Sequence, residues 1–150
     1  MRDGPGLSGK KIGFTAGAFD LCHAGHILMF KEAKSQCDYL IVGLHTDPSL
    51  DRPGVKNKPI MTVDERMIIL RSIKYIDEIL TYDTEAELYA LLKENTLGID
   101  VRILGEEYKN RTFTGNDLLM SLYFNTRDHS YSTTELRARV YEAEKTKRSE

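Results

Sequence analysis

Short apolar runs alternate with longer amphipathic stretches along the chain. Residues 11–16 (KIGFTA) and 39–45 (YLIVGLH) are apolar runs of strand length, and the second contains β-branched residues. Three later runs are also strand candidates: residues 75–82 (YIDEILTY), 100–105 (DVRILG) and 118–125 (LLMSLYFN). The pattern therefore predicts five short strands.

Helices are predicted between these strands. Residues 24–36 have the spacing of a helix with apolar side chains on one side. Three further helices begin with a capping box, in which a Ser or Thr is followed three positions later by Glu. The pairs are Thr62 with Glu65, Thr84 with Glu87, and Ser132 with Glu135. We expect the first of these helices over 61–73, the second to end at Gly98, and the last over about 132–141.

Strands that alternate with helices indicate an α/β fold, here a Rossmann-like three-layer α/β/α arrangement with a mostly parallel five-stranded sheet. A single domain is expected over residues 11–142, after a flexible segment at 1–10 and before a frayed tail at 143–150. In such sheets ligands bind beyond the carboxyl ends of the strands, where helices begin. Functional residues are therefore expected at the starts of the helices.

Composition narrows the possible classes of protein. Of the 150 residues, 41% are hydrophobic and 29% are charged, with a formal net charge of −2. This charge does not indicate the large basic face that binds nucleic acid, and no apolar run is long enough to insert across a membrane. The first residues lack the apolar core of a secretory signal, and Cys22 and Cys37 are too few for a disulfide framework. We therefore expect a cytoplasmic protein with reduced thiols.

Two histidines stand at the start of the helix predicted over 24–36. His23 and His26 are three apart, so both rings face one side, and Gly25 between them lets a ligand approach the backbone. Unpaired amides and the helix dipole attract anions there, which suits a polyphosphate with imidazoles as added donors. Two alternatives remain: one histidine caps the helix while the other is on the surface, or Cys22 joins both histidines around zinc. The zinc alternative lacks the paired spacing of a structural site and an evident fourth ligand.

A second cluster of polar residues precedes the last helix. Ser132, Thr133 and Thr134 place three hydroxyls over its start, and Arg127 supplies a fixed cation just ahead of them. By itself this pattern is typical of a plain capping box beside an exposed arginine. If both helix starts face one crevice at the strand ends, their residues would hold a single polyphosphate.

Four segments follow one another in the order of a known family. GAFDLCHAGH resembles the pattern G-x-F-D-x-x-H-x-G-H, and RDHSYSTTEL resembles R-T-E-G-I-S-T-T-x-(I/L). DERMIILRSIKYIDEIL resembles a segment that begins with E-R, and LGEEY resembles a short acidic G-D-D-W stretch. Together, from about Lys11 to Val140, they resemble the cytidylyltransferase branch of the HxGH nucleotidyltransferases, most of all the small bacterial glycerol-3-phosphate cytidylyltransferases.

The resemblance implies a reaction in which CTP and a small phosphorylated alcohol give a CDP-alcohol and pyrophosphate. It assigns His23 and His26 to the triphosphate, as catalytic donors near the α-phosphate. Ala18 and Phe19 fall where the family's first strand turns toward the nucleotide. Asp20 is expected to organise that turn.

The second segment of the family supplies further assignments. Arg127, as a catalytic residue, and Ser132, Thr133 and Thr134 would hold the β- and γ-phosphates at the last helix. Arg66 matches the arginine of the E-R pair and is expected to be structural or to face a phosphate.

Related members carry a catalytic lysine about ten residues before the arginine of the E-R pair. Lys56 lies ten residues before Arg66, and Lys58 lies eight before it. We expect Lys56 to bridge the phosphates of CTP and acceptor, with Lys58 as its substitute. For each of them a solvated loop lysine is the alternative. The segment that holds them, residues 46–59, has the Pro and Gly content of a loop that closes over substrate.

Two departures from the family concern the second segment and the acceptor. Residues 127–131 read RDHSY in place of R-T-E-G-I. The family's acceptor-binding lysine is missing from the acidic stretch 81–92 (TYDTEAELYALL), and four residues could replace it: Arg52, Lys58, Lys109 or Arg111. Phosphoethanolamine or another small polyol phosphate is therefore also open as the acceptor.

The family also implies a cation and an assembly. Mg²⁺ is expected as the counter-ion of CTP, without named metal-binding residues, and a homodimer is implied. Three other functions stay open: an adenylyltransferase of the same superfamily that uses ATP, a nucleotide-binding module without catalysis, and a zinc-dependent interaction domain.

Overall fold

One five-stranded parallel sheet forms the centre of the protein. The structure, a computed structural model, describes residues 9–149. The strands lie in the order β3-β2-β1-β4-β5, and every neighbouring pair is parallel. They are β1 (Ile12–Gly17), β2 (Tyr39–His45), β3 (Glu78–Tyr82), β4 (Val101–Leu104) and β5 (Ser121–Phe124). The predicted Rossmann-like α/β fold is confirmed.

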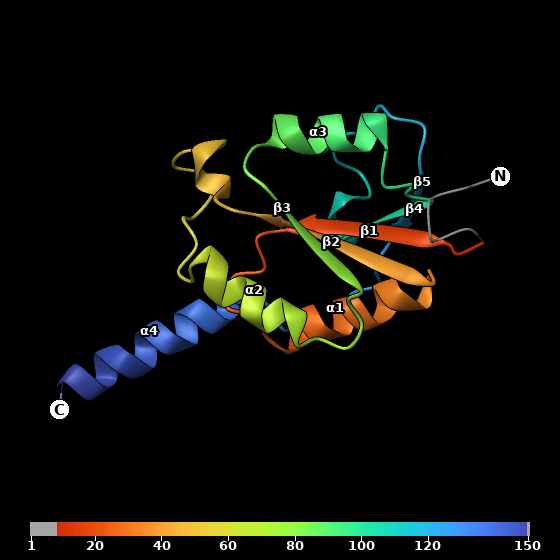
Figure 1. The fold of residues 1–150 in the computed structure, drawn as a ribbon. Helices are drawn as coiled ribbons and strands as arrows, with labels where there is room; N and C mark the ends of the chain where they lie inside the picture. Colours follow the sequence, from red (N-terminus) through yellow and green to blue (C-terminus); the bar gives the residue numbers. More distant parts are fainter. Residues whose placement is uncertain (1–8, 150) are drawn as a thin grey trace.

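Helices cover both faces of the sheet. They are α1 (Ala24–Ser35), α2 (Val63–Arg71), α3 (Glu85–Glu94) and α4 (Thr133–Ser149), with short 3₁₀ turns η1 (Pro48–Leu50) and η2 (Glu106–Tyr108). In Figure 1, α1 and α2 lie on one face, α3 lies on the other, and α4 extends away from the body. The three layers place the starts of α1 and α4 near the carboxyl ends of the strands.

Two apolar clusters hold the layers together. On the α1 and α2 face, Phe30 and Leu70 pack with strand residues such as Leu40. On the α3 face, Leu88 packs with Phe14 and its neighbours. Burying each such side chain is worth roughly 1.5–3 kcal/mol, so the alternation of strands and helices sets the layering.

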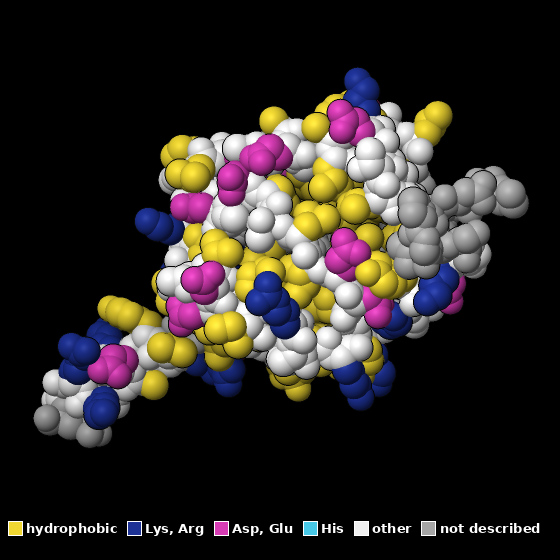
Figure 2. Space-filling model, in the orientation of Figure 1, with side chains coloured by type: hydrophobic (Ala, Val, Ile, Leu, Met, Phe, Trp, Pro, Cys, Tyr) yellow, Lys and Arg dark blue, Asp and Glu magenta, His cyan; other side chains and the backbone are white. Residues whose placement is uncertain are grey.

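Strand β3 forms one edge of the sheet. Most of its residues are only half-buried. In the view of Figure 1, it crosses the space between α3 and α2, and Figure 2 shows hydrophobic side chains gathered in the middle of this face. This edge is therefore only partly covered by the described chain.

The last helix is longer than predicted. It was expected to end near Tyr141, with a frayed tail over 143–150, but α4 continues to Ser149. Glu-to-Arg pairs one turn apart support the added length, including Arg148 Nε to Glu144 Oε1 at 2.7 Å. The predicted helix end near Tyr141 is therefore wrong, while the fraying of the tail stays a prediction, and residues 1–8 and 150 lie outside the described residues.

Helix α3 also ends differently from the prediction. Its capping box at Thr84 and Glu87 is present, but the helix stops at Glu94, before Gly98. Asn95 adopts the left-handed conformation with φ of 48°, and its side chain bonds both backbone groups of Ile99. Asn tolerates this conformation because its short polar side chain hydrogen-bonds locally, so it terminates the helix in place of glycine.

Candidate active site

Two adjoining hollows lie at the carboxyl edge of the sheet. The first, of about 680 Å³, is lined by residues that include His23, Arg127 and His129, and we call it the histidine hollow. The second, of about 510 Å³, has five basic side chains in its wall, and we call it the arginine hollow; these are Arg52, Lys56, Arg102, Arg111 and Arg137. The two share a floor that contains His26 and Thr133. The predicted crevice at the strand ends therefore has two compartments.

The two histidines of the first motif cap helix α1 and thereby fix each other. His23 Nδ1 accepts the backbone N–H of Gly25 at 3.0 Å, and His26 Nδ1 accepts the backbone N–H of His23 at 3.1 Å. Because Nδ1 accepts in both rings, the proton of each neutral imidazole is assigned to Nε2. The rings lie 4.1 Å apart, so the capping box presents two neighbouring N–H donors.

Both histidines favour the neutral form. Burial, and then the neighbouring His23, lower the pKa of His26, while Asp20 raises it. The result is a pKa of about 4. Burial, followed by His129 and Arg127, lowers the pKa of His23. Near pH 7 the pair therefore offers neutral donors, and a bound anion would raise both pKa values.

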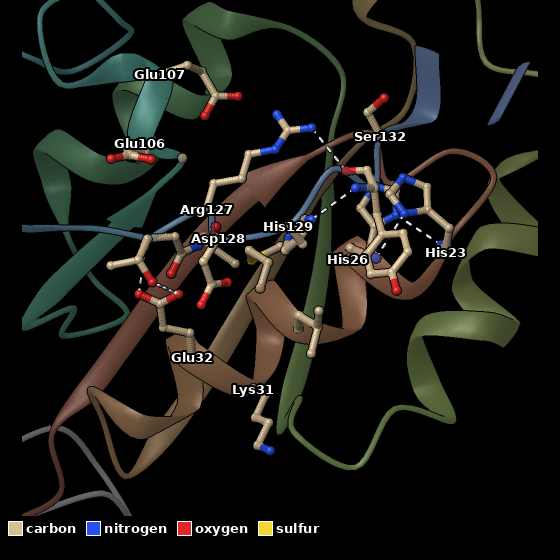
Figure 3. A pocket seen from close by; sticks show the side chains of 18 of the residues that line it. His23, His26, Lys31, Glu32, Glu106, Glu107, Arg127, Asp128, His129 and Ser132 are labelled. Atoms are coloured by element: carbon tan, nitrogen blue, oxygen red, sulfur yellow. Dashed lines mark hydrogen bonds between the residues drawn. The ribbon is translucent and has the colours of Figure 1, made fainter. Parts of the chain in front are cut away.

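A third histidine joins the pair from the other end of the chain. A Cβ added at Gly25 would lie 2.9 Å from His23 Cε1 and 3.1 Å from His129 Cε1. Glycine is therefore required for the two imidazoles to approach this helix start. In Figure 3 the rings of His23, His26 and His129 lie close together.

The turn after β1 is tightly held, as predicted for Asp20. Its carboxylate accepts the backbone N–H groups of Ile60 at 2.8 Å and Met61 at 2.9 Å, which ties the end of the long loop to this turn. Phe19 is buried with φ of 48° and packs edge-on against His26, with ring centres 5.9 Å apart. Ala18 lines the arginine hollow.

The start of α4 closes the histidine hollow. Ser132 Oγ accepts the backbone N–H of Glu135, which is one of the two bonds of the predicted capping box, and Thr133 Oγ1 lies 3.1 Å from His23 Nε2. Arg127 is exposed and donates through Nη2 to the carbonyl of Tyr131 at 3.0 Å. The structure thus brings the two motifs into direct contact across 110 residues.

Thr134 takes a different place from its two neighbours. It is exposed and lines the arginine hollow, together with Thr133. Ser132 lines only the histidine hollow. The three hydroxyls therefore divide between the compartments instead of facing one of them.

A carboxylate on α1 positions this second motif. Glu32 accepts the Tyr123 hydroxyl and the Thr126 backbone N–H, each at 2.8 Å, and the Thr126 hydroxyl at 3.1 Å. Thr126 directly precedes Arg127. Glu32 therefore fixes the exit of β5 relative to the helix that carries the histidines, as Figure 3 shows.

Arg66 is structural, which corrects its assignment to nucleotide binding. It is 2% exposed and donates to the carbonyls of Met61, Ala18, His45 and Thr46 at 2.7–3.1 Å. Four of the five guanidinium N–H groups are consumed by backbone oxygens, which leaves little capacity for a phosphate. Of the two roles expected for this arginine, the geometry fits the structural one.

The two loop lysines differ in position. Lys56 lines the arginine hollow, whereas Lys58 lines neither hollow. Both are exposed. Lys56 is therefore the one placed to reach a ligand beside the histidines.

The described chain offers no ready metal site. Over residues 9–149, no group of three or more His, Cys, Asp and Glu side chains is arranged to hold an ion. Burial raises the pKa of the Cys22 thiol, which disfavours the thiolate that binds zinc. The donor set therefore does not fit the zinc alternative, and any Mg²⁺ would depend mainly on phosphate and water oxygens.

Several residues of the two hollows were not predicted from the sequence. His129 and Asn125 line the histidine hollow, and Arg102 lines the arginine hollow. Asn125 is 5% exposed, and both polar atoms of its amide are buried without a hydrogen-bond partner in the described structure. His129 lies inside the quoted second motif and could have been found there, whereas a lone Arg or Asn in a strand region carries no signal.

No helix in the described part of the chain is both long and apolar enough to cross a membrane.

The chain is similar in sequence to part of several larger bacterial proteins. It is 34% identical over 139 residues to the bifunctional protein HldE of Aliarcobacter butzleri, covering 91% of this chain and 28% of that protein. It is 36% identical over 112 residues to the HldE protein of Caulobacter vibrioides, covering 75% of this chain and 23% of that protein. The chain thus spans about a quarter of the length of these curated relatives.

Solved structures share the fold. The lipopolysaccharide core biosynthesis protein from Thermoplasma volcanium superposes with a TM-score of 0.64 at 21% identity, covering 81% of this chain and all of that one. A bifunctional NMN adenylyltransferase/ADP ribose pyrophosphatase from Francisella tularensis, complexed with AMP and a manganese ion, superposes with a TM-score of 0.60 at 17% identity. The match covers 89% of this chain and 42% of that one.

A family model described as cytidylyltransferase-like matches residues 14–139. That span contains the starts of α1 and α4, nearly all of the sheet and the residues that line the two hollows. The resemblance seen in the motifs is thereby confirmed, and the chain belongs to the cytidylyltransferase-like family of nucleotidyltransferases.

Proposed function

We propose that this protein transfers CMP from CTP to a small phosphorylated alcohol, giving a CDP-alcohol and pyrophosphate. One observation carries the proposal: the donor-bearing histidines at the start of α1 meet the start of α4, with His23 Nε2 3.1 Å from Thr133 Oγ1. Arg127 lines the same hollow. Such convergence of donors and helix starts suits a triphosphate.

In the proposed reaction, a phosphate oxygen of the acceptor attacks the α-phosphorus of CTP in line. A new P–O bond forms, the bond to the β-phosphate bridging oxygen breaks, and pyrophosphate leaves with that electron pair. Nε2–H groups of His23 and His26 donate to the oxygens that gain charge, and Arg127 neutralises the leaving group. CTP would enter as its Mg²⁺ complex, and we derive no step through the ion.

Lys56 is proposed to bridge the phosphates of the two substrates. It lines the arginine hollow, which shares His26 and Thr133 with the histidine hollow. We expect Lys56→Ala to lower kcat by about tenfold or more, because one cation near the reacting phosphates is lost. The matched variant Lys58→Ala should stay within about twofold of wild type, and the opposite order would assign the role to Lys58.

ATP is the competing nucleotide, because two solved neighbours are described as adenylyltransferases, one of them putative. The test measures pyrophosphate release with CTP or ATP, Mg²⁺ and a panel of phosphorylated alcohols, and identifies the product by mass. CDP-linked product supports the proposal. An ADP-linked product would replace CTP with ATP, and nucleotide binding without any product would indicate a non-catalytic module.

A homodimer in the cytoplasm is part of the same proposal. Helix α4 buries none of its residues in the described chain and exposes Val140 and Tyr141. An exposed apolar pair of this kind is compatible with a contact to a second copy. Size-exclusion chromatography with light scattering should give twice the chain mass of 17.1 kDa. A mass of one chain would rule out the homodimer.

A further inference from the structure

Three polar side chains meet at the α3 end of the arginine hollow. Tyr82 ends β3, Glu85 begins α3 and Arg102 lies within β4. All three line this hollow and none lines the histidine hollow. Tyr82 is 6% exposed and Arg102 is 5% exposed, so both side chains are held inside the fold while bordering open space.

Arg102 is a buried cation without a carboxylate bound to it. Its Nη1 donates to the carbonyl of Thr114, and its guanidinium lies over the ring of Phe113 at 5.2 Å. Within residues 9–149 no carboxylate lies within ion-pair distance of it and no second hydrogen bond reaches it, although Tyr82, Glu85 and Tyr108 stabilise its charge from a greater distance. Buried charge of this kind normally has a full set of partners, so the remaining donors point to a ligand.

Those free donors reach the hollow itself. Within the described chain, only the amide of Asn125 has unpartnered polar atoms that are sealed from solvent. The unpaired nitrogens of Arg102 are therefore not fully sealed from solvent, and Arg102 lines the arginine hollow. A ligand in the arginine hollow can accept hydrogen bonds from them without moving the backbone.

Beside Arg102, Tyr82 adds a hydroxyl that can donate a hydrogen bond, and Glu85 adds a carboxylate that can accept one. The Tyr82 ring stacks on His45 with centres 4.6 Å apart, and its hydroxyl has no partner among the described residues. Glu85 Oε2 accepts the Thr114 hydroxyl at 3.0 Å, and its other oxygen stays free of described partners. The end of the hollow thus offers a fixed cation, a hydroxyl and a carboxylate oxygen.

This mixture matches the chemistry of neighbouring alcohol groups. A hydroxyl both donates and accepts, so a carboxylate can take its proton while a guanidinium or a phenol donates to its oxygen. An ammonium or trimethylammonium group offers no acceptor and would be placed beside the positive charge of Arg102. The acidic sequence around Glu85 alone would have suited an amine, but the arginine from β4 offsets that negative charge and adds donors that an amine cannot accept from.

We propose that Tyr82, Glu85 and Arg102 form the subsite for the hydroxyl-bearing end of the acceptor, so that the enzyme selects polyol or sugar phosphates over amine-bearing ones. The inference rests on the proposed function, because the acceptor's phosphate would lie toward His26 and Lys56. It supplies residues for the acceptor where the family's lysine is missing.

The first test compares acceptors with the unmodified protein. Glycerol 3-phosphate, erythritol 4-phosphate, phosphoethanolamine and phosphocholine are each assayed with the nucleotide that supports turnover. We expect kcat/KM at least about tenfold higher for the two hydroxyl-bearing phosphates, the scale of one or two lost hydrogen bonds. Equal or better use of phosphoethanolamine would overturn the subsite while leaving the transferase reaction intact.

The second test removes one polar group at a time, with Tyr82→Phe, Glu85→Gln and Arg102→Gln. Each should raise KM for the hydroxyl-bearing acceptor about tenfold while KM for the nucleotide stays within about twofold. Tyr82→Phe keeps the ring that stacks on His45, so it tests the subsite even if Arg102→Gln fails to fold. Unchanged acceptor KM in the folded variants would overturn the proposal.

Matched controls lie outside both hollows. Tyr89→Phe, Glu94→Gln and Arg71→Gln make the same chemical changes at residues that line neither hollow, and should leave both KM values unchanged. If wild type shows no turnover with either nucleotide, the proposed function fails. The subsite is then judged by calorimetric titration, in which tighter binding of glycerol 3-phosphate than of phosphoethanolamine supports it and the reverse removes it.

Discussion

The two hollows share a floor, but their polar groups are positioned in different ways. In the histidine hollow, His23 and His26 are fixed by backbone amides of the same helix start. In the arginine hollow, Tyr82 and Arg102 come from separate strands, each buried by packing. The two histidines proposed to act on the phosphates are thus held by local backbone geometry, whereas the residues proposed to choose the acceptor depend on long-range contacts. Specificity can therefore change without disturbing the chemistry.

Removing Arg66 should weaken the wall of the arginine hollow, which depends on long-range contacts. Arg66 donates to the carbonyls of Ala18 and His45, which line that hollow, and to the carbonyl of the neighbouring Thr46. Arg66→Met should lower the free energy of unfolding by about 4 kcal/mol, because buried carbonyls lose their donors. Urea denaturation measures this, with the exposed Arg71→Met as control. A loss below about 1 kcal/mol would show that the arginine hollow does not depend on these bonds.

His26 lies on the floor that the two hollows share, and removing its imidazole should impair the reaction itself. We expect His26→Ala to lower kcat by roughly 10²–10³-fold, the usual cost of losing one preorganised donor at a developing negative charge. Circular dichroism and the urea midpoint serve as controls for folding. Turnover within about threefold of wild type in a folded variant would exclude His26 from the reaction.

The pH dependence of stability should also trace to the histidine hollow. Burial lowers the pKa of His26 from 6.5 to about 4, so between these values the unfolded chain binds a proton that the folded chain does not. The free energy of unfolding should therefore fall as pH drops through this window, by roughly 3 kcal/mol from this residue. Between pH 7 and pH 4, the free energy of unfolding of His26→Gln should therefore fall by roughly 3 kcal/mol less than that of wild type. If the free energy of unfolding of both proteins changed equally with pH, His26 would not be the source of this pH dependence.

The contact between α1 and β5 is expected to have a smaller effect. Glu32→Gln replaces a carboxylate that accepts three hydrogen bonds and should cost about 1–2 kcal/mol of stability. Because Thr126 precedes Arg127, kcat should fall several-fold more than it does in the control Glu94→Gln. Unaltered kcat would mean that Arg127 is positioned by its own bond to Tyr131.

Local interactions explain why much of the architecture was predictable. Each N-terminal cap joins groups three residues apart, so Thr62, Thr84 and Ser132 mark their helices before any tertiary contact exists. The ends were less predictable. Asn95 replaces Gly98 as the stop of α3, and α4 runs past Tyr141, because side-chain bonding decides which of several permissive residues terminates a helix.

The amino-acid sequence by itself determined the order of strands and helices, the capped helix starts and the pair of imidazoles, because these depend on neighbours within one helical turn. Only the tertiary structure decided that His129 joins that pair, that Arg66 is used up by backbone carbonyls and that Arg102 is left with free donors. The physical reason is that a charged or titratable group takes its role from its partners and its burial. Both are set by the packing of elements that lie far apart in the chain.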